Sequence, residues 1–202
     1  MIDQLTKLRI IPVVAIESSL DAEPLADALC EGGLPVAEIT LRTDAGIGAI
    51  AALSRRQDFL VGAGTVHSVE QAKRVADAGA KFIVSPGFNP KTVQWCLDHQ
   101  MPIFPGTSSP TDLEMALEFG LSVVKFFPAE QIGGVKMVKA LASPYGDLRF
   151  IPTGGIHAGN LSDYLNLPSV IACGGSWMVK SNWLTEGRFE EIKRMTAEAV
   201  AL

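Results

Sequence analysis

One lysine stands at the centre of an apolar run, and its surroundings make it a candidate nucleophile. The run from Leu121 to Glu130 is rich in β-branched and aromatic residues, a composition typical of a buried strand, and Lys125 lies in its middle. Burial favours the neutral form of an amine, and a neutral amine can attack a carbonyl carbon to form a Schiff base. A lysine that reaches solvent, or that only pairs with an acid, would do no chemistry. Other residues must distinguish these two interpretations.

A polar side follows the period of two along a predicted strand at 36–41. Glu38, Thr40 and Arg42 fall on one side of the strand, and the residues between them are apolar. If the apolar side faces helices, the other side carries a proton-transfer group and a guanidinium that can hold a carboxylate through paired hydrogen bonds. The alternative is an internal hydrogen-bonded network that only keeps the strands in register.

The elements that must position these residues alternate along the whole chain. Strands are predicted at 10–16, 36–41, 59–63, 81–85, 103–105, 121–130, 149–153 and 170–173. Helices are predicted at 21–30, 45–55, 69–78, 90–99, 111–119, 134–141, 161–165 and 189–201. Ser68 is the predicted N-cap of the third of these helices, in a capping box with Gln71.

Strict alternation implies parallel strands joined by helical crossovers, and eight such pairs predict a closed (β/α)8 (TIM) barrel. The length predicts one domain over residues 1–202. An open doubly wound sheet is the alternative. It is less favoured because Glu17-Ser18-Ser19, the turn after the first strand, lacks the glycines of a dinucleotide-binding loop.

In a barrel, catalytic residues lie at the carboxyl ends of the strands. Lys125 and Glu38 both fall on even-numbered strands, which supply common layers of the interior, so contact between them is expected. The last two strands end in glycine-rich turns, Thr153-Gly154-Gly155-Ile156 and Gly174-Gly175-Ser176-Trp177. Such turns often hold a phosphate through backbone N–H groups, and Ser176 can add a hydroxyl. Among the remaining turns, Thr65 is placed nearest a bound substrate.

Composition excludes several classes of function. Apolar residues make up 48% of the chain, charged residues make up 19%, and the formal net charge is −5. This charge argues against a general affinity for nucleic acid or an anionic membrane. No apolar run approaches the roughly 18–20 residues that span a bilayer, and neither the three cysteines nor the three histidines have the spacing of a metal site. We expect a cytoplasmic protein that binds a small molecule and needs no metal or cofactor.

Motifs from the second to the eighth predicted strand resemble those of the 2-keto-3-deoxy-6-phosphogluconate (KDPG) aldolase family. They are Ala37–Thr43, Val61–Val66, Ser85–Gly87, Val124–Glu130, Pro152–Ile156 and Gly174–Trp177. The lysine motif with its Phe-Phe-Pro-Ala-Glu tail is the most specific of them. The resemblance covers nearly the whole chain.

The resemblance implies a metal-free class I aldolase in which Lys125 forms the Schiff base with the substrate's keto group. Glu38 would be the general acid/base, Arg42 would bind the carboxylate, and Thr65 would lie close to the carbinolamine. The remaining predicted substrate contacts are Pro86, Phe127 and Thr153, and the predicted phosphate contacts are Gly154, Gly155, Gly174, Gly175 and Ser176.

Members of this family are commonly homotrimers that cleave KDPG to pyruvate and glyceraldehyde 3-phosphate. Many also split 4-hydroxy-2-oxoglutarate (KHG) into pyruvate and glyoxylate. Two departures affect the carry-over: Glu17 stands where some members have a basic residue, and His157 stands where a serine often follows the isoleucine. The alternatives are an aldolase for the C4-epimeric phosphogalactonate, another phosphate-binding barrel enzyme such as an epimerase or a thiamine phosphate synthase-like transferase, and a silent sugar-phosphate sensor.

Overall fold

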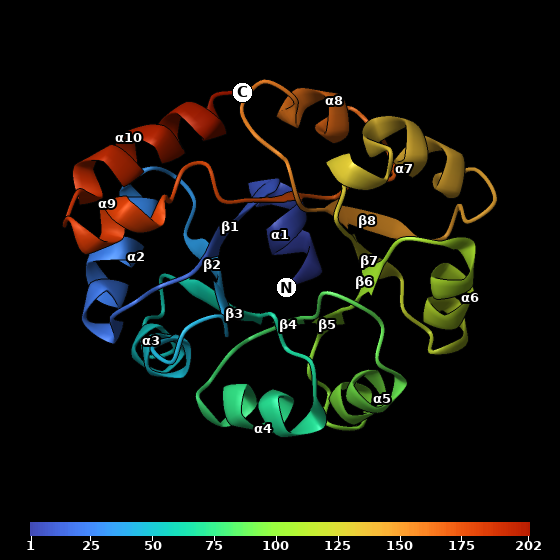
Figure 1. Ribbon diagram of the computed structural model, residues 1–202, viewed down its shortest axis with the longest axis horizontal. Coiled ribbons are helices and arrows are strands. Elements are labelled where there is room, and N and C mark those ends of the chain that lie inside the picture. Colours follow the sequence, from blue (N-terminus) through green and yellow to red (C-terminus); the bar gives the residue numbers. More distant parts are fainter.

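The computed structural model describes residues 1–202 as an α/β fold in which helices surround curved parallel sheets (Figure 1). The strands are β1 Ile10–Val14, β2 Val36–Thr40, β3 Leu60–Gly64, β4 Ile83–Val84, β5 Ile103–Phe104, β6 Gly106–Thr107, β7 Val123–Phe126, β8 Arg149–Pro152 and β9 Cys173–Gly175. The α-helices are α1 Ile2–Leu8, α2 Ala22–Glu31, α3 Gly46–Leu53, α4 Val69–Asp77, α5 Pro90–Asp98, α6 Pro110–Glu118, α7 Gly134–Ala142, α8 Leu161–Leu165, α9 Ser181–Thr185 and α10 Phe189–Val200. Two 3-10 helices, η1 Ser19–Asp21 and η2 Glu130–Ile132, complete the elements.

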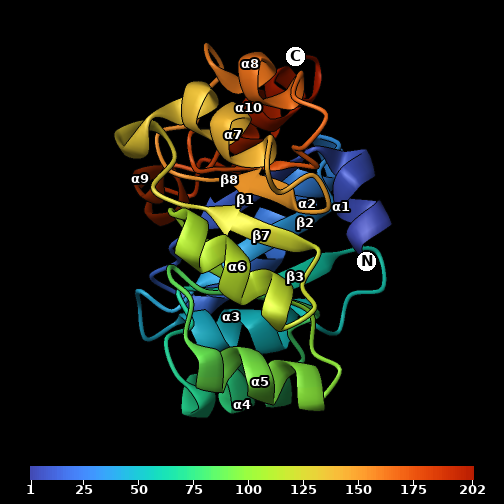
Figure 2. The same cartoon turned by 90° about the vertical axis from the view of Figure 1, so that its right-hand side faces the viewer.

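The strands form two parallel sheets whose order follows the chain. One has the order β5-β4-β3-β2-β1-β9, and the other has the order β6-β7-β8. Pro105 separates β5 from β6, because proline has no N–H to donate to a neighbouring strand. Isolated parallel bridges, Phe150 to Val170 and Thr153 to Gly174, link the β8 side to the β9 side. Figure 2 shows helices α6 and α7 in front of β7 and β8, on the outer side of the sheet.

The core has two parts, and the alternation along each strand assigns residues to one or the other. A cluster of 46 buried residues, including Ile39 and Phe126, fills the space between strands and helices. A smaller cluster of 10 residues, including Val36 and Val123, lies on the other face of the sheet. These positions confirm the predicted sides of β2 and β7.

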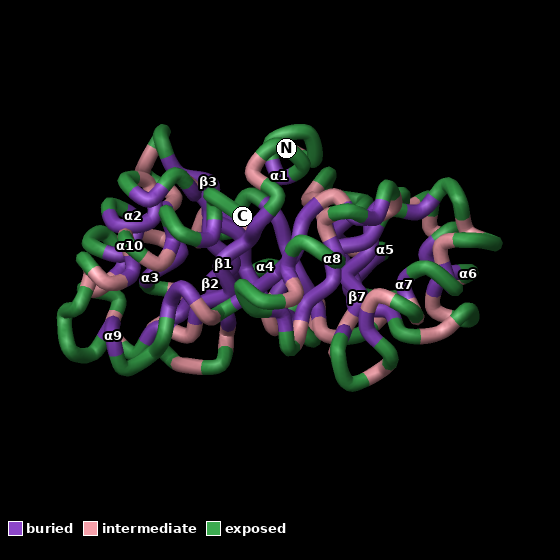
Figure 3. Tube along the Cα trace, turned by 90° about the horizontal axis from the view of Figure 1, so that it is seen from above, coloured by how far each residue is buried: buried purple, intermediate pink, exposed green.

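Helix α1 was not expected from the sequence, because only Leu5 of its seven residues is buried. Leu5 belongs to the smaller cluster with residues at the starts of β2, β3 and β7, so α1 covers the amino ends of the strands. Figure 3 shows this helix at one edge of the molecule, beside the buried strands. No helix is both long enough and apolar enough to cross a membrane.

The predicted cap of α4 is correct, and the predicted capping box is wrong. The Ser68 side chain accepts a hydrogen bond from the Gln71 N–H. The Gln71 side chain accepts from the N–H of His67 instead of returning to Ser68. A complete capping box occurs on α6, between Ser109 and Asp112.

Candidate active site

A lysine and a glutamate from distant strands meet in the interior. Lys125 on β7 is 6% exposed and Glu38 on β2 is 3% exposed. The Nζ of Lys125 lies 3.5 Å from Oε1 of Glu38. This distance is within the range of an ion pair, but Oε1 makes no hydrogen bond. The expected contact is therefore present as an ion pair through Oε1, without a direct hydrogen bond to that oxygen.

The neighbouring strand is shaped to receive the Glu38 side chain. A Cβ added at Gly64 on β3 would lie 2.1 Å from Oε1 of Glu38, so only glycine leaves room for the carboxylate there. Thr40, on the same side of β2, donates a hydrogen bond of 2.8 Å to the Val14 carbonyl. Of the three polar residues of this strand side, Thr40 therefore has the structural role, tying β2 to β1.

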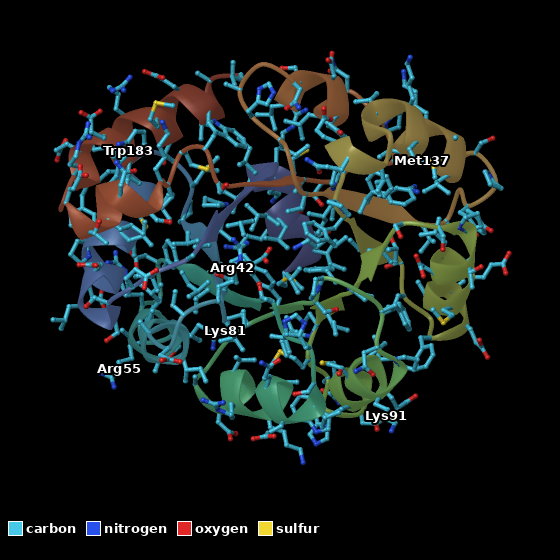
Figure 4. All side chains as sticks on the ribbon, in the orientation of Figure 1. Arg42, Arg55, Lys81, Lys91, Met137 and Trp183 are labelled. Atoms are coloured by element: carbon cyan, nitrogen blue, oxygen red, sulfur yellow. The ribbon has the colours of Figure 1, made fainter.

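A small pocket opens beside the lysine. The Phe127 ring lies 5.0 Å from Nζ of Lys125, within reach of a cation–π contact, and the same residue lines a pocket of about 100 Å³. The other lining residues are Val13, Arg42, Thr153, Gly154, Gly155, Ile156, Gly174, Gly175 and Ser176. Figure 4 shows Arg42 near the centre of the ring of strands. Its exposed guanidinium makes no ion pair or hydrogen bond within the protein, so it is free to bind an anion.

The two glycine turns pack against each other and present unused donors. Gly154 and Gly155 have φ values of 102° and 78°, in the region that favours glycine. A Cβ at Gly174 would lie 2.4 Å from the Thr153 hydroxyl, so this glycine allows the turns to approach closely. The backbone N–H groups of Gly154, Gly155 and Ser176 have no acceptor within the protein. Unpaired N–H groups that line a pocket form a site for an anion.

Two of the predicted substrate contacts lie at neighbouring strand ends and outside this pocket. Thr65 follows β3 with a φ of 61°, a strained conformation for a β-branched residue and one that is often found at functional sites. Pro86 follows β4, where its carbonyl oxygen would lie 2.1 Å from a Cβ at Gly106. The structure thus places both residues at the same end of the strands as Lys125 and Arg42.

Two residues differ from those common in the family that the sequence resembles, and both lie at the surface near the carboxyl ends of the strands. Glu17 and His157 are both exposed, and neither lines the pocket. Nδ1 of His157 accepts a hydrogen bond from the Gly159 N–H. Two larger hollows, of about 380 Å³ beside α4 and α5 and about 560 Å³ near Arg55, contain none of the predicted site residues. No group of three or more His, Cys, Asp or Glu side chains is placed to hold a metal ion.

Residues 1–195 match the family model for KDPG and KHG aldolases. The chain belongs to this family. It is 51% identical over 201 residues to the 2-dehydro-3-deoxy-phosphogluconate aldolase of Treponema pallidum, covering 99% of this chain and 96% of the relative. It is 41% identical over 197 residues to the KHG/KDPG aldolase of Escherichia coli, covering 97% of this chain and 92% of the relative.

A solved structure of the same family is also similar. The KDPG aldolase of Legionella pneumophila, with pyruvate captured as a covalent carbinolamine intermediate, superposes with a TM-score of 0.94 at 37% identity. The match covers 98% of this chain and 97% of that structure.

Two lining residues of this aldolase pocket were missed in the sequence. Val13 is one of them. The period of two puts it on the same side of β1 as Ile11, which belongs to the smaller core cluster, and this could have identified it. Ile156 is the other. It follows the glycine pair directly, but its apolar side chain gives no sign of a site residue.

Proposed function

We propose that this aldolase cleaves KDPG to pyruvate and D-glyceraldehyde 3-phosphate through a Schiff base on Lys125. The observation that carries the proposal is the buried pair of Lys125 and Glu38, in which one carboxylate oxygen has no hydrogen-bond partner. A nucleophilic amine beside a proton-transfer group is the arrangement that imine formation needs. The names of the curated relatives supply the substrate.

Chemistry begins when a proton moves from Nζ of Lys125 to Glu38, which leaves a neutral amine. The amine attacks the C2 carbonyl carbon, and the resulting carbinolamine loses water with proton transfer from Glu38 to give a protonated imine. This cation accepts the electrons of the C3–C4 bond when Glu38, directly or through a water, removes the C4 hydroxyl proton. The aldehyde leaves, the enamine takes a proton at C3, and water releases pyruvate and restores the amine.

The two ends of the substrate have separate partners in this proposal. Arg42 binds the carboxylate, Thr65 lies near the carbinolamine, and Pro86, Phe127 and Thr153 complete the walls of the substrate site. The phosphate binds the unpaired N–H groups of Gly154, Gly155 and Ser176, beside Gly174 and Gly175. Holding both ends fixes the reacting carbon beside Lys125, and positioning of this kind can contribute on the order of 7–11 kcal/mol.

We further propose that the strands close into a single (β/α)8 domain over residues 1–202. The bridges from Phe150 to Val170 and from Thr153 to Gly174 support closure, because they join the β8 side to the β9 side. Hydrogen exchange tests it: amides on both sides of these bridges should be protected to the same degree as those between β1 and β2.

KHG cleavage, a cytoplasmic location and a homotrimer are also part of the proposal. The name of the Escherichia coli relative supports KHG as a second substrate, and the family resemblance supports the trimer. Turnover of KHG to glyoxylate tests the first, and cell fractionation tests the location. Sedimentation equilibrium tests the trimer, since one chain has a mass of 21.5 kDa.

Borohydride reduction in the presence of pyruvate tests the central proposal. Peptide mass spectrometry should find a stable adduct on Lys125 in the wild-type protein and none in Lys125→Met. Lys91→Met, which changes an exposed lysine on α5, should keep the adduct. Pyruvate release from KDPG should fall by about 10⁴-fold or more in Lys125→Met and stay near wild type in Lys91→Met. Folded wild-type protein that gives no adduct on any lysine would overturn the proposal.

A further inference from the structure

The N-cap residue of helix α8 ties together both halves of one glycine turn. Asn160, the residue before the helix, donates from Nδ2 to the Gly155 carbonyl at 3.1 Å. Its Oδ1 accepts from the His157 N–H at 2.8 Å. One amide side chain thus spans the turn and fixes the direction of the peptide that follows Gly155.

One turn further along, within α8, a second side chain is linked to the same loop through Glu130. Tyr164 is fully buried, and its hydroxyl donates to the Glu130 carboxylate. Glu130 in turn packs on the loop, since a Cβ at Gly155 would lie 2.7 Å from Cβ and Cγ of Glu130. The N–H of Glu130 also donates to the Gly154 carbonyl at 3.1 Å.

We propose that α8 positions the anion-binding turn, with Asn160 and Tyr164 as positioning residues for the phosphate-bearing end of the substrate. Glycines have the widest choice of backbone conformations, so a pair of them loses more freedom than other residues on being held in one conformation. A turn held in advance presents its unpaired N–H groups without that cost at binding. The inference rests on the proposed function, because it assigns these residues to the phosphate of the same substrate.

The chain offers a matched control for each residue. Asn89 also precedes a helix, α5, where its side chain accepts from the Lys91 N–H and donates to the His67 carbonyl, both at 3.1 Å. Tyr145 also donates its hydroxyl to a glutamate, Glu114, at 3.0 Å. Neither control residue contacts the glycine turn through these bonds, so each variant removes the same kind of interaction elsewhere.

The test compares Asn160→Ala with Asn89→Ala and Tyr164→Phe with Tyr145→Phe. For each protein, kcat and KM are measured with KDPG, and the pyruvate concentration that gives half-maximal borohydride trapping is measured separately. Pyruvate has no phosphate, so its trapping reports on the lysine end of the site and not on the phosphate site. We expect the KM for KDPG to rise about three- to ten-fold in Asn160→Ala and Tyr164→Phe, the effect of one lost hydrogen bond. Their kcat, their pyruvate trapping and both control variants should stay within two-fold of wild type, a limit of roughly 0.4 kcal/mol.

Two results would overturn the inference. One is an unchanged KM for KDPG in both α8 variants, and the other is a rise in the half-saturating pyruvate concentration equal to the rise in KM. Tyr164→Phe keeps the buried ring and leaves Glu130 in contact with water, so it decides the question if Asn160→Ala does not fold. A wild-type protein that gives no pyruvate adduct would instead overturn the proposed function.

Discussion

Nζ of Lys125 and Oε1 of Glu38 lie 3.5 Å apart, although the two residues come from β7 and β2 and are 87 positions apart in the chain (125 − 38). The pair is buried, and Oε1 has no hydrogen bond. Oε1 is compensated only by the ion pair, and the desolvation cost of burying such a pair can exceed the attraction between its charges, so stability alone does not account for this arrangement. Because Oε1 has no hydrogen bond within the protein, it keeps the capacity to accept one.

Glu38→Gln should separate proton transfer from the shape of the site. Glutamine has nearly the same volume but cannot accept and return a proton, so kcat with KDPG should fall by about 10²–10⁴-fold. Lys125 remains, so prolonged borohydride treatment with pyruvate should still label it. Steady-state assays and mass spectrometry check both parts, and a kcat within ten-fold of wild type would remove Glu38 from the mechanism.

Gly64→Ala should damage catalysis by displacing one side chain. The added methyl group would lie 2.1 Å from Oε1 of Glu38, which forces the carboxylate out of its position beside Lys125. A displacement of about 1 Å can cost on the order of 10²-fold in rate, so we expect a drop in kcat of that size. Gly87→Ala is the control, since a Cβ at Gly87 meets nothing within 4 Å. Equal kcat values for the two variants would contradict the prediction.

Arg42→Ala should weaken substrate binding and leave stability unchanged. The guanidinium is exposed and unpaired, so its removal breaks no ion pair or hydrogen bond within the protein. Losing a charged hydrogen-bonding partner of the carboxylate costs about 1.5–3 kcal/mol, which corresponds to a rise in KM of roughly 10- to 150-fold. Arg42→Lys should recover only part of the lost affinity for the substrate, because an ammonium cannot form the paired hydrogen bonds that a guanidinium makes with a carboxylate.

The control for Arg42 is Arg55→Ala, since Arg55 is another exposed arginine without an ion pair and lines a different hollow. Its KM should match wild type. Urea unfolding of the three variants checks stability, and a large loss of stability in Arg42→Ala would show that Arg42 has a structural role.

Stability should fall in alkaline solution because two thiols are buried. Burial raises the pKa of Cys96 and of Cys173 from the ordinary 9.0 to about 12. Between these values the unfolded chain loses the thiol protons and the folded protein keeps them, so the free energy of unfolding decreases as the pH rises. The slope approaches about 1.4 kcal/mol per pH unit for each thiol. Urea unfolding at several pH values above 9 checks this, and the Cys96→Ala/Cys173→Ala double variant should have a shallower slope than wild type.

The sequence predicted the meeting of Lys125 and Glu38 because the evidence for it is local. Alternation along each strand gives the side of a residue, and the order of strands gives its layer. The glycine turns were predicted for the same reason, since glycine pairs at strand ends are visible in the chain itself. Pro105 is equally visible in the sequence, but the predicted strand at 103–105 did not anticipate that this proline separates two short strands.

The contacts of α8 could not be predicted in the same way. Asn160 and Tyr164 act through partners on other loops, and nothing in the local pattern of residues 161–165 identifies those partners. Thr40 shows that position alone can also suggest too much. It lies on the same side of its strand as Glu38, which is the position expected of a site residue, but its hydrogen bond to the Val14 carbonyl on the neighbouring strand gives it a structural role.

Leu5 on α1 lies in the interior beside the amino ends of the strands, so the space around Lys125 opens only at their carboxyl ends. Reactants and products then enter and leave the site through the same opening. In the proposed mechanism the pyruvate half is bonded to the buried Lys125, and the phosphate end lies toward the exposed Ser176. The aldehyde has to depart before pyruvate can follow, and in the synthetic direction pyruvate has to enter first. A seven-residue helix at the start of the chain thereby closes one end of the strands, and in the proposed mechanism the covalent bond to Lys125 sets the order in which the two products leave by the other end.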